Sequence, residues 1–117
     1  MMISIDIPGA KIVEVGGDPA LAFGSYKFEQ EDIRKILECG NVRGILFYQA
    51  TFNSVDLSIL QPLQLKRLTV LHGGFGDVEL SQIKNFDSLT SLKLLDTKVS
   101  ETALSDFLYE NPQVNLI

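Results

Sequence analysis

The sequence predicts an α/β fold in which parallel strands form one face and short helices form the other, wound as a right-handed solenoid. The first observation is a repeat, because large apolar residues recur at steps of 23–25 residues. The second is that apolar residues lie two apart early in each repeat, as in Ile45 and Phe47, which is the spacing of a strand with one buried face. The third is that they lie three or four apart later in each repeat, as in Leu104, Phe107 and Leu108, which is helical spacing. A period this short is typical of solenoids, in which each unit buries its apolar side against its neighbours.

Residues 1–17 lie outside the repeat. Apolar residues alternate with polar ones over residues 3–7, a Pro-Gly break follows, and Ile12, Val13 and Val15 form a second apolar run. This pattern predicts a hairpin that ends at Gly16 and Gly17. Because the end of a solenoid would otherwise expose its apolar interior, we expect the hairpin to cap the first unit.

Residues 18–117 contain about four units of 23–25 residues and a final strand. The repeat is anchored by Leu21, Ile45, Leu68, Leu92 and Ile117. The side chains of Ser54, Asp77 and Ser100 can accept hydrogen bonds from free backbone N–H groups, so they are predicted to begin helices. The last strand, Val114–Ile117, leaves an unpaired strand edge at the end of the sheet.

The strand segments of the later units resemble those of the leucine-rich repeat family. Leu65–Val70 and Leu89–Leu94 fit the opening L-x-x-L-x-L of that family, and Val42–Phe47 is a looser copy. The resemblance covers roughly residues 18–117, and it implies a solenoid whose common role is protein recognition, including inhibition of enzymes by covering them. One departure is that the family usually places Asn or Cys five residues after the second Leu of the motif. Here those positions are occupied by Tyr26, Ala50, Gly73 and Thr97, of which only Thr97 could make the equivalent hydrogen bond.

Composition and length indicate a single domain, residues 1–117, with 45% hydrophobic residues. Ten basic and fifteen acidic residues give a net charge of −5 that is spread along the chain, which argues against nucleic-acid binding and permits a basic protein partner. Cys39 is the only cysteine, so an internal disulfide is excluded. The start has no signal-peptide pattern, and no apolar run approaches the about 18 residues of a membrane span, so we expect a cytoplasmic protein without membrane contact.

The sequence offers little catalytic chemistry. One His and one Cys cannot supply the four ligands of a structural zinc site. The segment His72–Gly76 lacks both the Gly-x-Ser-x-Gly turn of lipases and the Lys-Ser or Lys-Thr of a phosphate loop, so we interpret its glycines as a tight turn after a strand. The carboxylates are scattered over predicted helix starts and wet helix faces. We therefore predict no catalytic residue, no cofactor, no metal and no enzymatic activity.

The predicted binding surface is the outward face of the sheet. Because side chains alternate along a strand, residues between and after the buried anchors point away from the core. One outward row is apolar, which is typical of a protein-binding patch when polar groups surround it. The predicted partner-binding residues are Leu46, Tyr48, Gln49, Arg67, Thr69, Leu71, His72, Lys93, Leu95 and Asp96.

These observations favour a non-enzymatic protein-protein interaction module that binds a partner through its sheet face. A narrower hypothesis is an inhibitor or immunity protein that neutralises a basic toxin or nuclease. One alternative is a scaffolding unit that self-associates through the C-terminal strand edge. Another is a small regulatory domain of the sigma-factor-antagonist type, although the Asp-Ser-Ser/Thr-Gly loop of such domains is absent and Asn53–Asp56 is its nearest analogue.

Overall fold

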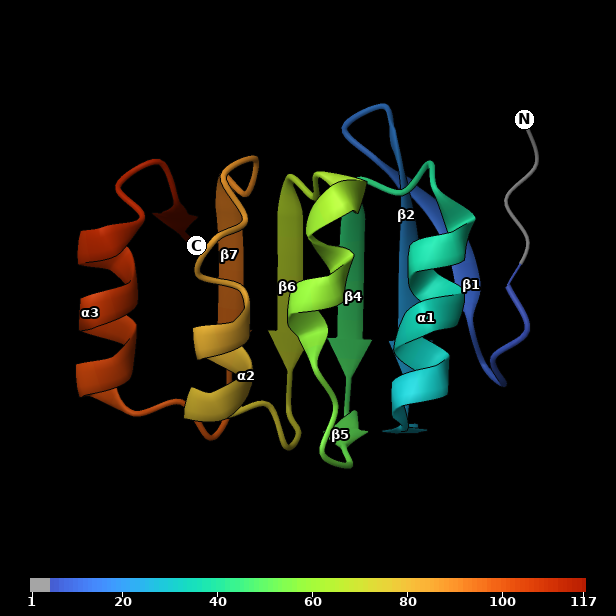
Figure 1. The fold of residues 1–117 in the computed structure, drawn as a ribbon, viewed down its shortest axis with the longest axis horizontal. Coiled ribbons are helices and arrows are strands. Elements are labelled where there is room, and N and C mark those ends of the chain that lie inside the picture. Colours follow the sequence, from blue (N-terminus) through green and yellow to red (C-terminus); the bar gives the residue numbers. More distant parts are fainter. Residues whose placement is uncertain (1–4) are drawn as a thin grey trace.

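The computed structural model describes residues 5–117 and shows a six-stranded sheet with its helices on one face (Figure 1). The strands lie in the order β1-β2-β4-β6-β7-β8. Their bounds are Lys11–Val15 (β1), Asp18–Gly24 (β2), Gly44–Tyr48 (β4), Arg67–Leu71 (β6), Ser91–Leu95 (β7) and Asn115–Leu116 (β8). β1 pairs antiparallel with β2, and the other pairs in this sheet are parallel. A second, small sheet joins β3 (Lys27–Phe28) to β5 (Thr51–Phe52).

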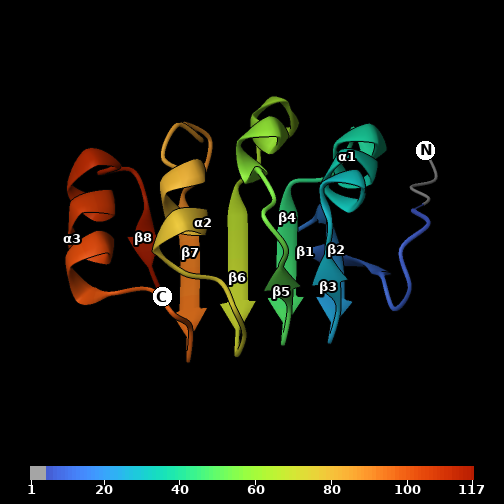
Figure 2. The same cartoon turned by 60° about the horizontal axis from the view of Figure 1, so that its bottom comes forward.

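The helical segments all cover the same face of the sheet, as Figure 2 shows. They are α1 (Gln30–Cys39), the 3-10 helix η1 (Leu57–Leu63), α2 (Asp77–Gln82) and α3 (Glu101–Glu110). The predicted start at Ser100 is confirmed, because its Oγ accepts a hydrogen bond from the N–H of Ala103 at 3.1 Å. In the second unit Asp56 caps η1 instead of Ser54. Pro62 inside this segment has no N–H to donate, which disfavours a regular α-helix there.

The core lies between the sheet and the helices, and the strand pairing explains the repeat. The anchors Leu21, Ile45, Leu68 and Leu92 stand in register on neighbouring strands, and all are buried. Aromatic rings that lie two and seven positions after these anchors pack against one another across the units. The ring column contains Phe23, Phe28, Phe47, Phe52 and Phe75, with neighbouring centroids 5.2–6.0 Å apart. The apolar positions of the repeat are therefore the core of this sheet.

The prediction of a leucine-rich-repeat-like right-handed solenoid is wrong. The described chain is a compact mixed α/β molecule with a mainly parallel sheet, measuring 38 × 27 × 21 Å with a Cα radius of gyration of 13.1 Å. A compact domain of this length is expected to have a radius of gyration of about 13 Å. The units are also unequal, because their helical segments have ten, seven, six and ten residues and differ in helix type. Only the α/β class and the parallel sheet with helices on its other face are retained from that prediction.

The predicted capping hairpin is wrong in its pairing. Ile3 lies outside the described residues, and Ile5 and Ile7 are not in a strand, although Ile7 is buried against the core. Instead, β1 pairs with β2, the first strand of the repeat, across a two-residue turn. Gly16 and Gly17 form that turn with φ values of 58° and 87°, a left-handed backbone that glycine adopts without strain. The cap is consequently part of the main sheet.

The register predicted for the final strand is wrong by one residue. Leu116, and not Ile117, pairs with Leu92, so the last step of the repeat is the same as the preceding one. Ile117 donates its N–H to the carbonyl of Leu92 at 2.9 Å, which places its side chain off the core row, and it is exposed. β8 adds only two residues to the sheet.

Candidate functional site

The candidate site is the outer face of the sheet, which is the face that α1, η1, α2 and α3 leave uncovered. The strand register places Leu46, Thr69 and Lys93 in one row and Tyr48, Leu71 and Leu95 in the next. Tyr48 is 42% exposed and Leu95 is 50% exposed, whereas Leu46, Leu71 and Thr69 are half-buried. The structure therefore brings the predicted apolar stripe together on adjacent strands.

β1 extends this apolar surface, which the sequence pattern did not predict. Val13 pairs with Ala20 and Val15 with Asp18, so both valine side chains lie on the outer face. They line a shallow, mainly apolar groove of about 80 Å³ together with Leu46 and Thr69. The signal that could have shown this is the two-residue Gly16-Gly17 turn, which pairs residues 12–15 with the strand that follows. We call Val13, Val15, Leu46, Tyr48, Leu71 and Leu95 the apolar band.

A polar rim borders the apolar band where the parallel strands end. It consists of Ser25, Gln49, His72 and Asp96, which all have a left-handed backbone with φ between 48° and 57°. Backbone N–H groups of the rim donate to the carbonyl of the neighbouring strand, for example Gln49 N to Leu71 O at 2.9 Å. The side chains pair as Ser25 Oγ with Gln49 Oε1 at 2.9 Å and His72 Nδ1 with Asp96 Oδ2 at 2.9 Å. The repeated turn thus presents four polar side chains in a row at one edge of the sheet.

His72 is the most chemically versatile residue of the rim. Its ring packs edge-on against Tyr48 with centroids 5.8 Å apart, and the Asp96 carboxylate orients the ring through Nδ1. A histidine held in this way can transfer protons through its other nitrogen. Within residues 5–117, no hydroxyl or thiol is hydrogen-bonded to His72, so the structure supplies no nucleophile beside it.

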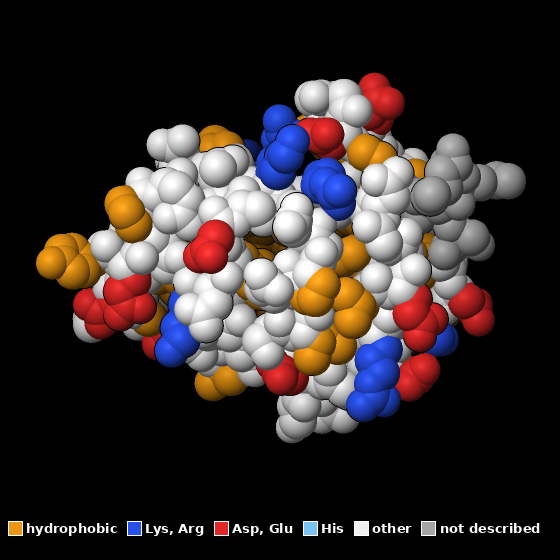
Figure 3. All heavy atoms as spheres, turned by 45° about the horizontal axis from the view of Figure 1, so that its top comes forward, with side chains coloured by type: hydrophobic (Ala, Val, Ile, Leu, Met, Phe, Trp, Pro, Cys, Tyr) orange, Lys and Arg blue, Asp and Glu red, His pale blue; other side chains and the backbone are white. Residues whose placement is uncertain are grey.

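Arg67, a predicted partner contact, is instead committed to the chain itself. Its Nη1 donates to the carbonyl oxygen of Val15 at 3.0 Å and lies 3.4 Å from Asp18 Oδ2. Gly16 leaves room for this guanidinium, because a Cβ at that position would lie 2.6 Å from Arg67 Nη2. Lys66 Nζ lies 3.7 Å from the same carboxylate. Figure 3 turns this edge forward and shows basic and acidic side chains side by side.

The acidic residues are concentrated on the helices and not on the outer face. α2 contributes two carboxylates and α3 three, and neither helix contains Lys or Arg. These five residues are Asp77, Glu79, Glu101, Asp106 and Glu110. The charged side chains that the described strands direct to the outer face are Lys11, Asp18, Arg67 and Lys93. Asp18 is paired with Arg67 and Lys66, so Lys11 and Lys93 are the charges of these strands that have no ion-pair partner within residues 5–117, and the polar rim adds the carboxylate of Asp96, which pairs with His72.

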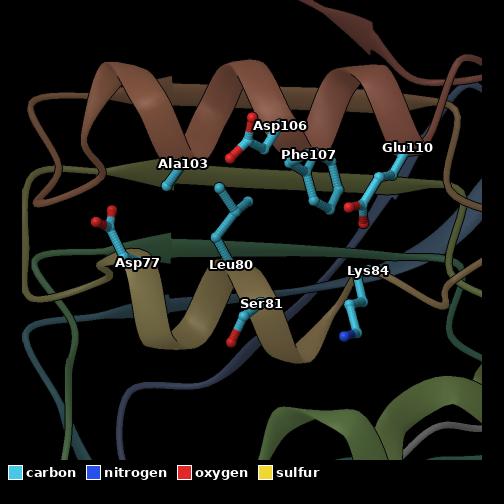
Figure 4. Close-up of a pocket in the computed structure, with 8 residues that line it drawn as sticks. All are labelled: Asp77, Leu80, Ser81, Lys84, Ala103, Asp106, Phe107 and Glu110. Carbon is cyan, nitrogen blue, oxygen red and sulfur yellow. The ribbon is translucent and has the colours of Figure 1, made fainter.

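A groove of about 240 Å³ lies between α2 and α3. Figure 4 shows Leu80 from α2 and Phe107 from α3 pointing into the space between the helices. Asp106, Glu110 and Lys84 border the groove. Asp77 also lines it, but its two carboxylate oxygens accept hydrogen bonds from Ser100 N at 2.7 Å and Ser100 Oγ at 2.9 Å. Asp77 therefore connects the two helices, and its carboxylate is already engaged within the molecule.

A second hollow, of about 330 Å³, lies beside Cys39. Lys35 lines this hollow, and its Nζ donates to the carbonyl oxygen of Asp6 at 3.1 Å. Burial, and next the charge of Glu38, raise the pKa of the Cys39 thiol. A raised pKa disfavours the thiolate, so Cys39 is a weak nucleophile at neutral pH.

In the described part of the chain, no three His, Cys, Asp or Glu side chains form a group that could hold a metal ion. No helix among residues 5–117 is long and apolar enough to cross a membrane. No protein-family model matches this chain, and neither a curated protein nor a solved structure is significantly similar to it. The resemblance to leucine-rich repeats therefore stays a prediction from the motif alone.

Proposed function

We propose that this protein is a non-catalytic binding module that recognises another protein with the outer face of its sheet. The observation that supports this proposal is the apolar band, which no described element covers. Contiguous apolar side chains bordered by polar groups are the usual anatomy of a protein-binding surface. Tyr48 and Leu95 are its exposed centre and far end.

The energy available from this surface is that of a few apolar side chains. Full burial of a Leu side chain contributes about 1.5–3 kcal/mol. Because Leu95 is half exposed, its burial by a partner contributes about 1 kcal/mol. Tyr48 can add a ring contact while its hydroxyl group remains near water.

The charges around the apolar band favour a partner with carboxylates at the edge of an apolar contact. Lys11 and Lys93 are exposed on the outer face, and neither has an ion-pair partner within residues 5–117. Charges at the rim of an interface steer association more than they raise affinity. Association is accordingly expected to slow as the salt concentration rises.

The test uses coexpression with the product of the adjacent gene as the probe. Tyr48→Asp and Leu95→Asp should each abolish capture of that product, because a charge replaces an apolar contact. The matched control is Tyr109→Asp on α3, where the side chain is 88% exposed and lies on the helical side of the molecule. Capture that survives both substitutions on the sheet would contradict the proposal.

A second candidate function is inhibition of a basic enzyme or toxin, and the charge of α2 and α3 favours it. A basic partner would find carboxylates on the helices, at Asp106 and Glu110, and few on the outer face. Replacing both by Lys should then abolish binding, while Tyr48→Asp should leave it unchanged. The two candidates therefore predict opposite outcomes with the same set of variants.

A further inference from the structure

Within residues 5–117, no hydrogen bond pairs the outer backbone groups of the edge strand β1. The two-residue turn makes Val15 and Asp18 a hydrogen-bonded pair, and the pattern alternates along the strand, so residues 11, 13 and 15 bond to β2. The hydrogen bond from Arg43 N to Pro19 O at 2.9 Å agrees with this alternation. It shows that the backbone groups of the odd-numbered residues of β2 bond toward β4, so those of the even-numbered residues bond to β1. The N–H and C=O groups of Ile12 and Glu14 consequently point away from the sheet.

β1 is also largely apolar, and no element of residues 5–117 covers it. Ile12 is 50%, Val13 39% and Val15 45% exposed, and all five residues of the strand are exposed. It contains no proline and no bulge, which are features that usually protect an edge from pairing. The opposite edge, β8, is shorter, with two residues against five.

The β1 segments of two copies are complementary in an antiparallel pair, both in their backbone groups and in their side chains. In an antiparallel pair centred on Val13, Ile12 of one copy lies opposite Glu14 of the other, so each outward N–H meets an outward C=O. Lys11 lies opposite Val15, and no like charges face each other. A two-fold axis perpendicular to the sheet keeps the helices of both copies on the same side.

We propose that β1 is a self-pairing site, at which a second copy of this chain binds by antiparallel β1–β1 pairing about an axis at Val13. The two sheets then form one continuous sheet, and the apolar bands of the two copies meet at their valines. This inference does not rest on the proposed function, because the pairing uses backbone groups at the edge. It differs from self-association through the strand edge at Val114–Ile117, which the sequence also allows.

The first test is sedimentation of the whole protein over about a hundredfold range of concentration, since dimerisation follows mass action. The wild type should form a dimer as concentration rises. Glu14→Pro removes an outward N–H while every bond to β2 remains, so it should be monomeric and folded by far-ultraviolet circular dichroism. Glu14→Gln keeps the N–H and should dimerise like the wild type. Tyr48→Asp should dimerise too, which separates this proposal from partner binding.

The second test checks the register and does not need a proline. At Val13 the two Cα atoms would be about 4.5 Å apart in a non-hydrogen-bonded pair, which suits a disulfide. Val13→Cys should therefore form a covalent dimer with oxidised glutathione. Ile12→Cys should not, because its two copies would be about 8 Å apart, beyond disulfide reach. The wild type, which retains Cys39, measures the background.

Three results would overturn the proposal. One is a wild type that stays monomeric at every concentration, and another is equal cross-linking of the Val13→Cys and Ile12→Cys variants. The third is a dimer that Glu14→Pro leaves intact and Val114→Pro abolishes, which would assign assembly to the C-terminal edge.

Discussion

Gly73 lies at a point where the backbones of two consecutive units of the repeat approach each other closely. A Cβ at this position would lie 2.5 Å from the carbonyl oxygen of Ala50 on the preceding unit. Neither atom can rotate away, because one is a backbone atom and the other is bonded directly to the backbone. The same carbonyl accepts the N–H of Gly74 at 2.9 Å, so moving it weakens that hydrogen bond. Overpacking costs about 1–3 kcal/mol, and the lost hydrogen bond adds about 1 kcal/mol. We expect Gly73→Ala to lower the free energy of unfolding by about 2–4 kcal/mol.

The neighbouring glycine is a matched control. A Cβ at Gly74 would meet Thr51 Cγ2 at 3.4 Å, which is ordinary contact, so Gly74→Ala should change stability by less than about 1 kcal/mol. Urea unfolding followed by circular dichroism measures both variants. With about 2.1 cal/mol/K of unfolding entropy per residue, the Gly73→Ala loss corresponds to a fall in Tm of about 8–16 °C. Equal midpoints for the two variants would refute the close approach between units.

Two further predictions concern Tyr26 and the rim. Partial burial, and next the hydrogen bond to Asp32, raise the pKa of Tyr26 above its usual 10.0. The unfolded chain therefore loses this proton first, so the stability that Tyr26 contributes is complete below pH about 10 and declines as pH rises toward the folded-state pKa. Urea midpoints measured across this range should fall more steeply for wild type than for Tyr26→Phe, and parallel curves would contradict the assignment. Gln49 has a left-handed backbone with φ 54°, so Gln49→Gly should raise the free energy of unfolding by about 0.5–1 kcal/mol, whereas Gln49→Ala should not raise it. Thermal unfolding measures both variants. A loss of stability with glycine would contradict backbone strain at this position.

The sequence predicted the strands better than it predicted the overall form. Ile45 and Leu68 were expected one above the other, and the register confirms it, because a buried row with a period of two admits little slippage. The repeat carried no information about how regular the connecting segments are, and η1 and α2 differ in type and length. A compact molecule resulted where a solenoid was expected.

The candidate site was predicted in part. Alternation along strands placed Tyr48 and Leu95 on the outer face, and both are exposed there. The contact of Arg67 with Asp18 could not be predicted, because it joins residues 49 apart that are brought together only by the pairing of β2, β4 and β6. Val13 was missed because the pairing partner of its strand was assigned to the wrong segment.

The carboxylates of α2 and α3 lie on the helical side of the sheet, whereas Lys11 and Lys93 lie on its outer face, so charge is distributed unevenly between the two sides of the molecule. A charged surface nearby would rotate such a molecule before any contact formed, so encounters would be orientated and not random. An acidic neighbour would meet the sheet first and a basic one would meet the helices first. The orientation at first encounter would therefore report the sign of the neighbour's charge.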